Sequence, residues 1–448
     1  MEVFESVLTQ ISDMLWGYPI IILLFGTHLF LTFRLKFIQR FIGKAIKISL
    51  RRDKEGKGDI SQFGALTTAL AATIGTGNIV GVATAVAAGG PGAVLWMWLT
   101  GVFGIATKYS EALLSVKYRI KMPDGSMAGG PMYVIERGLN QKWLAVLFAA
   151  FTSVTAFGIG NMVQANSISL LAQESFQIPM WVTGLILTVL TAIVIIGGIK
   201  SIARVCEGLI PFMAITYVLG CLIILFMNLE GIPNTISLIF NSAFTGQAAI
   251  GGFIGAGMKE AMRYGIARGL FSNESGLGSA PIVAAAAQTK NPIRQALVSS
   301  TGTFWDTVVV CAMTGLVIVN SNEWMEGLSG AALTNQAFRD FHIIGPIVLT
   351  LGLLTFVFST ILGWSYYGEK AAEYLFGSKV IKPYRYLWVI FVMIGSVLSL
   401  NIVWTFADIT NALMALPNLV SLIFLSKVIV NETQKYLWSG NLEQENDE

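Results

Sequence analysis

Charged residues are scarce in this sequence: Asp, Glu, Lys and Arg make up 12% of the 448 residues, whereas a soluble chain averages about 25%. Hydrophobic residues account for 54%. This balance excludes an ordinary soluble domain and predicts a polytopic membrane protein whose main partner is the lipid bilayer. The net charge of +3 indicates no acidic partner, because the basic residues cluster in loops, and no binding of nucleic acid is expected.

Histidine and cysteine are also rare, with two and three copies. No H-E-x-x-H or Ser-His-Asp pattern is present, so an enzyme is not expected. The cysteines, Cys206, Cys221 and Cys311, lie in apolar runs without a C-x-x-C pair, which argues against a disulfide framework or a metal knuckle. The N-terminus is acidic where a signal peptide needs basic residues, so the first apolar segment is expected to remain as a helix.

Long apolar runs are abundant, and about 20 such residues cross a bilayer as a helix. The sequence therefore predicts an all-α chain with eleven transmembrane spans. The loop after the first span carries nine Lys and Arg residues between positions 34 and 57, and such loops stay in the cytoplasm. This places the N-terminus outside and the C-terminus in the cytoplasm. The predicted spans are 15–35, 63–88, 92–117, 143–172, 180–198, 205–227, 262–288, 295–320, 343–367, 384–401 and 404–427.

The second predicted span is interrupted at residues 73–78, Thr-Ile-Gly-Thr-Gly-Asn. Gly75 and Gly77 let the backbone leave helical geometry, and freed N–H and C=O groups at bilayer depth must line a cavity or bind a ligand. A half-helix that starts near Asn78 would point its amides at an anion, while carbonyls of the preceding half could face a cation. The alternative is that small residues only allow close helix packing.

A second interruption lies at residues 272–281, where a carboxylate, an asparagine, two glycines and a proline interrupt an apolar run. If the first span is an addition, the two breaks fall in core helices one and six, each opening a set of five. Such matched breaks indicate an inverted-repeat transporter with a site at the midplane. The predicted division is 1–35 (outer end and added helix), 36–62 (basic cytoplasmic loop), 63–227 (first repeat), 228–261 (extracellular connection, with 246–263 at the interface), 262–427 (second repeat) and 428–448 (cytoplasmic tail).

Four runs together resemble the alanine or glycine:cation symporter family. They are GTGNIVGV at 75–82, GGPG at 89–92, SNESGLGSAP at 272–281 and STILGWSYYGE at 359–369. The resemblance extends over nearly the whole chain. It implies a leucine-transporter-like fold of five plus five core helices, with broken helices one and six, that imports alanine or glycine by symport with sodium in the cell membrane. Coupling to protons, or another small zwitterionic solute, is the alternative.

The resemblance also implies residue roles. The amides of Thr76 and Gly77 would receive the substrate carboxylate, and carbonyls of the second break would accept from its amino group. Asn78 could ligate sodium or brace the loop, or act as a helix N-cap. Trp364 could close a small pocket or lie at the cytoplasmic interface. The full set of substrate candidates is Thr73, Gly75, Thr76, Gly77, Asn78, Gln164, Phe271, Ser272, Asn273, Gly276 and Trp364.

For the co-transported sodium ion, the resemblance implies the carbonyls of Ala71 and Ile74 with the hydroxyls of Ser359 and Thr360. Hard oxygen ligands suit a hard cation; the alternative for the hydroxyls is bonding within their own helix.

Four further intramembrane charges stand out from the residues themselves. Glu274 would brace the second break or balance the charge of sodium and ammonium, and Asp306 is a candidate for gating or ion coupling. Lys108 and Glu111, spaced i, i+3, are expected to form a structural ion pair.

Overall fold

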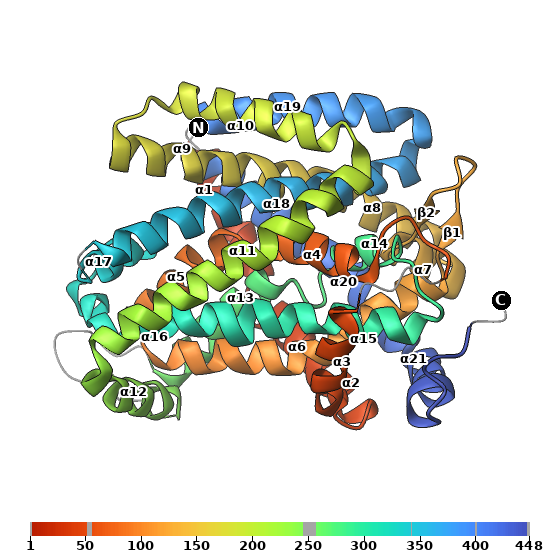
Figure 1. The fold of residues 1–448 in the computed structure, drawn as a ribbon, viewed down its shortest axis with the longest axis horizontal. Coiled ribbons are helices and arrows are strands. Elements are labelled where there is room, and N and C mark those ends of the chain that lie inside the picture. Colours follow the sequence, from red (N-terminus) through yellow and green to blue (C-terminus); the bar gives the residue numbers. More distant parts are fainter. Residues whose placement is uncertain (1, 52–55, 245–256, 342, 399–400, 446–448) are drawn as a thin grey trace.

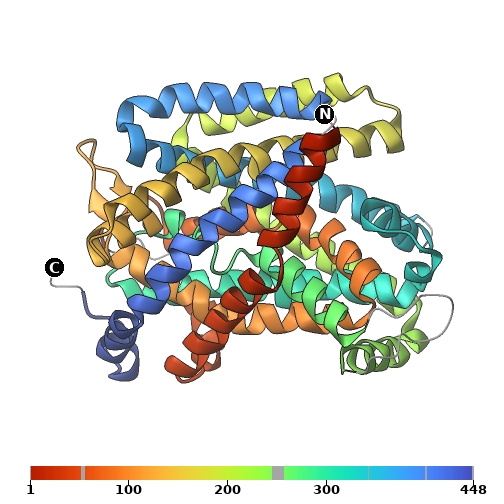
Figure 2. The same ribbon diagram turned by 180° about the vertical axis from the view of Figure 1, so that it is seen from behind.

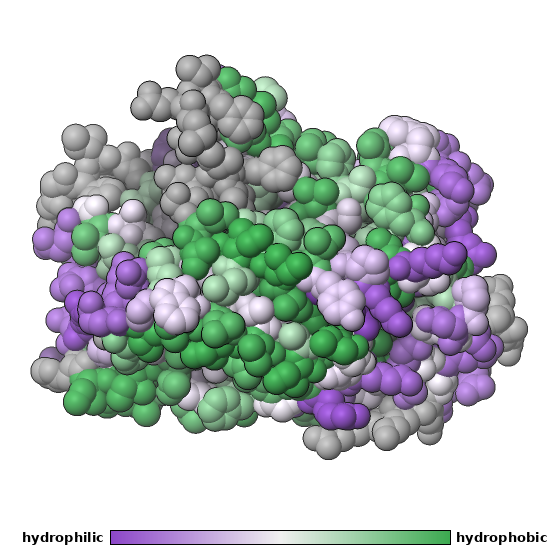
Figure 3. All heavy atoms as spheres, turned by 90° about the horizontal axis from the view of Figure 1, so that it is seen from above, coloured by the Kyte–Doolittle hydropathy of each residue, from purple (hydrophilic) through white to green (hydrophobic). Residues whose placement is uncertain are grey.

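The computed structural model describes residues 2–51, 56–244, 257–341, 343–398 and 401–445. Long helices run along the long axis of the molecule, and a short hairpin of β1 (Ile120–Lys121) and β2 (Met127–Ala128) lies at the end that carries the C-terminus (Figure 1). The face shown in Figure 3 is apolar across its middle and polar at both ends. This pattern is that of a protein whose helices cross a bilayer along the long axis.

The described residues of the first half form twelve α-helices. They are α1 (Glu2–Leu15), α2 (Tyr18–Arg34), α3 (Ile42–Ser49), α4 (Gln62–Thr73), α5 (Val80–Gly89), α6 (Gly92–Lys117), α7 (Pro131–Gly138), α8 (Lys142–Phe157), α9 (Val163–Phe176), α10 (Met180–Ile195), α11 (Gly198–Met227) and α12 (Ile232–Phe244).

The second half ends in the short α21 and a π-helical segment, Gln434–Trp438. Its helices are α13 (Met258–Asn273), α14 (Pro281–Ala284), α15 (Pro292–Thr303), α16 (Ala312–Ser321), α17 (Gly330–Arg339), α18 (Ile344–Phe376), α19 (Ile381–Val397), α20 (Asn401–Phe424) and α21 (Ser426–Thr433). Two π-helical segments, Gly158–Met162 and Phe304–Cys311, join α8 to α9 and α15 to α16 without a break.

By length and composition, six of the described helical segments can each cross a membrane. A seventh is added if the bent pair Tyr18–Arg34 and Ile38–Ser49 is one span. The protein is thus a multi-pass, all-α membrane protein, while the count of eleven spans stays a prediction. Some predicted spans fail this test for a physical reason: α4, α5 and α13 are short because the chain leaves helical geometry beside them.

Several boundaries differ from the sequence-based expectation. The predicted basic loop contains α3, and the predicted connection contains α12. The first helix of the second half begins at Met258 rather than 262, so Lys259 and Glu260 belong to it; residues 245–256 of the segment expected at the interface lie outside the described residues. The half-helix expected after the second break is the four-residue α14, because Ala287 turns to pair with Ile60.

Helix α6 lies against both α13 and α15 and forms the centre of the packing. Glycine permits the close approach of α13: a Cβ on Gly269 would lie 2.1 Å from Thr100 Oγ1. On the back of the molecule α1 and α20 lie side by side (Figure 2), and Trp16 Nε1 donates to the Asp408 carbonyl at 2.9 Å. The N-terminal helices therefore cover the outside of the bundle, and the two chain breaks lie inside it.

Candidate functional site

The first chain break separates α4 from α5. After α4 ends at Thr73, the Gly75 N–H donates to Asn78 Oδ1 at 2.9 Å, and a single 3-10 turn leads to Val80. Within the described part of the chain, the N–H groups of Thr76 and Gly77 form no hydrogen bond, although both residues are buried. Buried backbone donors are nearly always paired. Two unpaired amides at this position are therefore available to donate hydrogen bonds to a ligand.

The second break follows α13. Helix α13 ends at Asn273, and Glu274 takes a left-handed conformation with φ of 55°, which ends the helix. Asn273 Oδ1 accepts from the Ser275 N–H at 2.9 Å, so this turn is closed by a side chain. No hydrogen bond among the described residues uses the carbonyl oxygens of Phe271, Ser272 and Asn273. The second break therefore supplies free acceptors, whereas the first supplies free donors.

Asp306 ties the two breaks together. Its Oδ2 accepts from Asn78 Nδ2 at 2.8 Å, and its Oδ1 accepts from Ser272 Oγ at 2.9 Å and Thr307 Oγ1 at 2.7 Å. Asp306 lies in the π-helical segment between α15 and α16, and such segments often occur at functional sites. Asn78 thus braces the loop at both ends, because its Oδ1 also holds the Gly75 amide.

Glu274 is held by two donors from different parts of the chain. Trp364 Nε1 of α18 donates to its Oε1 at 3.0 Å, and Ser279 Oγ donates to its Oε2. Trp364 is 1% exposed and lies inside the bundle. A Cβ on Gly160 would lie 2.2 Å from Trp364 Cβ, so α18 packs directly on this glycine. Glu274 therefore joins the second break to α18.

The expected ion pair between Lys108 and Glu111 is wrong. Glu111 Oε1 instead accepts from the N–H groups of Gly276 and Gly278, at 3.1 and 3.0 Å, and from Asn418 Nδ2 at 2.7 Å. The Glu111 carboxylate thus accepts from two N–H groups that the second break leaves without a helical partner. Both glycines are far from Glu111 in the sequence. A Cβ on Gly276 would meet Leu24 and Leu419, so this residue faces α2 and α20.

Gln164 reaches the first break from α9. Its Nε2 donates to Thr76 Oγ1 at 3.4 Å and to the Ile159 carbonyl at 2.9 Å, and its buried Oε1 has no hydrogen-bond partner among the described residues. The π-helical segment before α9 frees the Ile159 carbonyl for this contact. Gln164 therefore presents a free acceptor beside Thr76.

The four candidate sodium ligands form two contacts between α18 and the end of α4. Ser359 Oγ lies 3.2 Å from the Ala71 carbonyl oxygen, and Thr360 Oγ1 lies 3.3 Å from that of Ile74. Both hydroxyls also lie within 3 Å of the Phe356 carbonyl oxygen of their own helix. The donor set consists of neutral oxygens, which fits an alkali cation.

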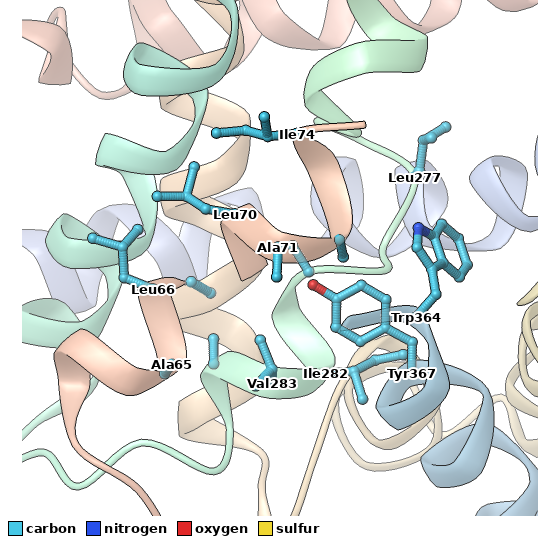
Figure 4. Close-up of a cluster of buried hydrophobic side chains, with 14 of the residues drawn as sticks. Ala65, Leu66, Leu70, Ala71, Ile74, Leu277, Ile282, Val283, Trp364 and Tyr367 are labelled. Atoms are coloured by element: carbon cyan, nitrogen blue, oxygen red, sulfur yellow. The ribbon is translucent and has the colours of Figure 1, made fainter. Parts of the chain in front are cut away.

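Figure 4 shows the apolar setting of this end of α4. Leu66, Leu70 and Ile74 lie along one side of α4 and its end, and Ala71 lies on the side that Trp364 and Tyr367 of α18 approach. The Tyr367 hydroxyl points toward α4 and has no hydrogen-bond partner in the described part of the structure. Sequence reasoning missed Tyr367; its position three residues after Trp364, on one helix face, was the available signal.

A cavity of about 380 Å³ reaches the first break from one end of the molecule. Thr76, Gly77 and Phe271 line its inner part, and the exposed Glu174 lines its mouth. Thr73, Gln164 and Trp364 are not among its lining residues. The site is therefore open to the end opposite the C-terminus.

The chain closes the other end by pairing two backbone segments. Lys57 and Ile60, before α4, form β-bridges with Thr289 and Ala287, after α14. Arg119 donates to the carbonyl oxygens of Ala285, Ala287 and Lys57 at 2.8–2.9 Å. Burial lowers the pKa of Arg119 to about 10, against the opposing effect of Asp59, so its side chain stays charged at neutral pH.

Comparison with known proteins decides the family. The model of the sodium:alanine symporter family matches residues 1–448. The chain belongs to the sodium:alanine symporter family. A relative named sodium/alanine symporter AgcS, from Methanococcus maripaludis, is 49% identical and aligns over 97% of each chain. An uncharacterized transporter of Haemophilus influenzae is 54% identical over 96% of each chain.

Solved structures show the fold. MhsT in complex with L-phenylalanine superposes with a TM-score of 0.57 at 14% identity, covering 84% of this chain and 98% of that one. A manganese transporter of Eremococcus coleocola gives 0.52 at 13% identity, covering 84% and 82%. The leucine-transporter-like fold and the family predicted from the sequence are thus confirmed. As a family member the protein is a sodium-coupled transporter and not an enzyme.

Proposed function

We propose that the protein imports alanine or glycine together with sodium, by alternating access to the two chain breaks. One observation carries the proposal: two free buried amides, at Thr76 and Gly77, lie in a turn that contacts α13, whose last carbonyls are also free. Fixed amides are suitable donors for a carboxylate, and carbonyls are acceptors for an ammonium group. An α-amino acid carries both groups one carbon apart.

The size of the substrate follows from the side chains beside the amides. A Cβ on Gly77 would lie 3.4 Å from Phe271 Cδ1 and 3.4 Å from Ser272 Cα, so α13 closely approaches the first break. The hydrogen bond between Gln164 and Thr76 limits the space on another side of these amides. This supports a small side chain on the substrate, and the 49% identical relative is named for alanine.

Sodium would bind to Ala71, Ile74, Ser359 and Thr360, and its role follows from their position. The two carbonyls belong to the end of α4, and the two hydroxyls belong to α18. An ion held between them would fix the first break in the shape that presents the Thr76 and Gly77 amides. Linkage then requires that the amino acid tightens sodium binding by the same factor.

We place the open cavity outside the cell and the paired segments around Arg119 in the cytoplasm, on the basic residues near the paired end. The N-terminus would then lie outside and the C-terminal tail inside. The two sets of five helices, 63–227 and 262–427, would be the inverted repeats that move against each other.

Uptake by the purified protein in proteoliposomes tests this proposal. Labelled L-alanine, glycine and L-leucine would be offered with an inward gradient of sodium, and again with potassium in its place. We expect accumulation of alanine or glycine with sodium alone, and little accumulation of leucine. Equal accumulation in potassium would contradict the proposed coupling to sodium. Preferential accumulation of leucine would contradict the proposal that the substrate is small.

A further inference from the structure

One buried lysine has no partner. Lys108 of α6 is 4% exposed, and its Nζ forms no hydrogen bond with any described residue. The other buried cationic side chains in the described ranges, Arg294 and Lys370, contact Glu443 and Glu373. A buried ammonium costs several kcal/mol unless other charges compensate it, so its position needs an explanation.

Lys108 lies where both chain breaks meet. It lines a small cavity of about 10 Å³, together with Thr73 at the end of α4, Ala280 before α14 and Ser299 of α15. A space of this size holds about one water molecule. Lys108 thus lies beside the last turn of α4, whose Ala71 carbonyl we assign to sodium.

The charges around Lys108 are mostly negative. Its positive charge attracts three buried carboxyl groups. They are Glu111, one turn further along α6, Glu274 in the second break and Asp306 between α15 and α16. His28 of α2 also lies within its field, and its Nδ1 is hydrogen-bonded to Thr107. Three buried carboxyl groups thus share the field of one fixed cation, before any sodium ion is bound.

We propose that Lys108 is a positioning residue whose fixed positive charge compensates the carboxyl groups of Glu111, Glu274 and Asp306 and weakens sodium binding. The inference rests on the proposed sodium site. Without the lysine, the carboxyl groups would attract sodium without opposition, and the ion would leave slowly on the cytoplasmic side. With it, sodium binds loosely enough to be released in each cycle.

The size of the effect follows from Coulomb's law. A unit charge on the order of 10 Å from the ion, at an effective dielectric constant of about 20, changes sodium affinity by ~10-fold. Because Glu111 has the opposite sign and lies one turn away on α6, its neutralisation should have an opposite effect of similar size. The two changes together should nearly cancel.

Four full-length proteins test the proposal: the natural chain, Lys108→Met, Glu111→Gln and the double variant. Methionine is uncharged and of similar length, and glutamine keeps an oxygen acceptor for the Gly276 and Gly278 amides. The sodium concentration that gives half-maximal alanine binding would be measured for each, together with the maximal uptake rate. The melting temperature of each protein checks its folding.

We expect the half-maximal sodium concentration to fall about tenfold in Lys108→Met, to rise in Glu111→Gln and to return near the natural value in the double variant. Maximal uptake by Lys108→Met should fall, because sodium release slows. A structural role alone would lower uptake and leave every half-maximal concentration unchanged, which would overturn the proposal. If Lys108→Met does not fold, an unchanged value in Glu111→Gln overturns it. If the natural chain binds alanine without sodium, the proposed function itself fails.

Discussion

Asp306→Asn is the sharpest perturbation of the link between the two breaks. The carboxylate accepts hydrogen bonds from Asn78, Ser272 and Thr307, at 2.7–2.9 Å. An asparagine has a single acceptor oxygen, so its amide nitrogen must face either the Asn78 amide nitrogen or the two hydroxyls. If the nitrogen faces Asn78, that hydrogen bond is lost; if it faces the hydroxyls, they can rotate to accept from it, but no bond then involves a charged group. Hydrogen bonds to charged groups are worth about 1.5–3 kcal/mol, against about 0.5–1.5 kcal/mol for neutral ones.

If the lost bond is the one that holds the first break, alanine binding should weaken by the same free energy. A loss of about 2 kcal/mol corresponds to ~30-fold in the dissociation constant. Binding of labelled L-alanine to purified protein in sodium chloride measures this. Thr307→Val is the matched control, because the Thr307 hydroxyl contacts the same carboxylate from its own helix and connects it to neither break.

We expect Thr307→Val to weaken alanine binding less than about threefold, since the lost hydrogen bond lies within one helix and both breaks stay attached to Asp306. Equal effects of the two variants would refute the reasoning, because the link to the breaks would then contribute nothing. Melting temperatures measured on the same samples separate loss of binding from loss of folding.

Four further outcomes follow from contacts described above. Thr360→Val should raise the sodium requirement of uptake about tenfold. Thr355→Val, at a half-buried position of the same helix, should not, because the Thr355 hydroxyl contacts only carbonyls of its own helix. Trp364→Phe should lower uptake several-fold at unchanged yield, since the ring stays and the bond to Glu274 is lost. Gly160→Ala should abolish folded protein in size-exclusion chromatography, because its Cβ would overlap Trp364. Arg119→Gln should increase the labelling of a cysteine introduced at the closed end; unchanged labelling would show that the clamp does not hold that end shut.

Much of this account was accessible from the sequence because the breaks are local. Gly75, Gly77 and the run 272–281 interrupt apolar segments, and hydropathy alone detects such interruptions. The resemblance then supplied the fold and the family, which the comparisons confirm. The roles of individual site residues stay predictions, although the structure brings Asn78, Ser272 and Asp306 within hydrogen-bonding distance.

The features that could not be predicted from the sequence depend on contacts between residues that are far apart in the chain. Glu111 was paired with Lys108 because both lie on one helix face, but the structure gives it amides more than 160 positions away. The π-helical segment around Asp306 has no signature in its apolar sequence, so the direction of that carboxylate was not predictable. The pairing of Ile60 with Ala287 likewise joins two segments that hydropathy treats as unrelated loops.

The central claim is that the amides of Thr76 and Gly77 receive a carboxylate only when sodium is bound. Calorimetric titration with L-alanine and with L-alaninamide, in sodium and in potassium, tests it most directly, because alaninamide keeps the side chain and amine but lacks the carboxylate. We expect heat of binding for L-alanine in sodium alone. Comparable binding of alaninamide, or of alanine in potassium, would contradict the account.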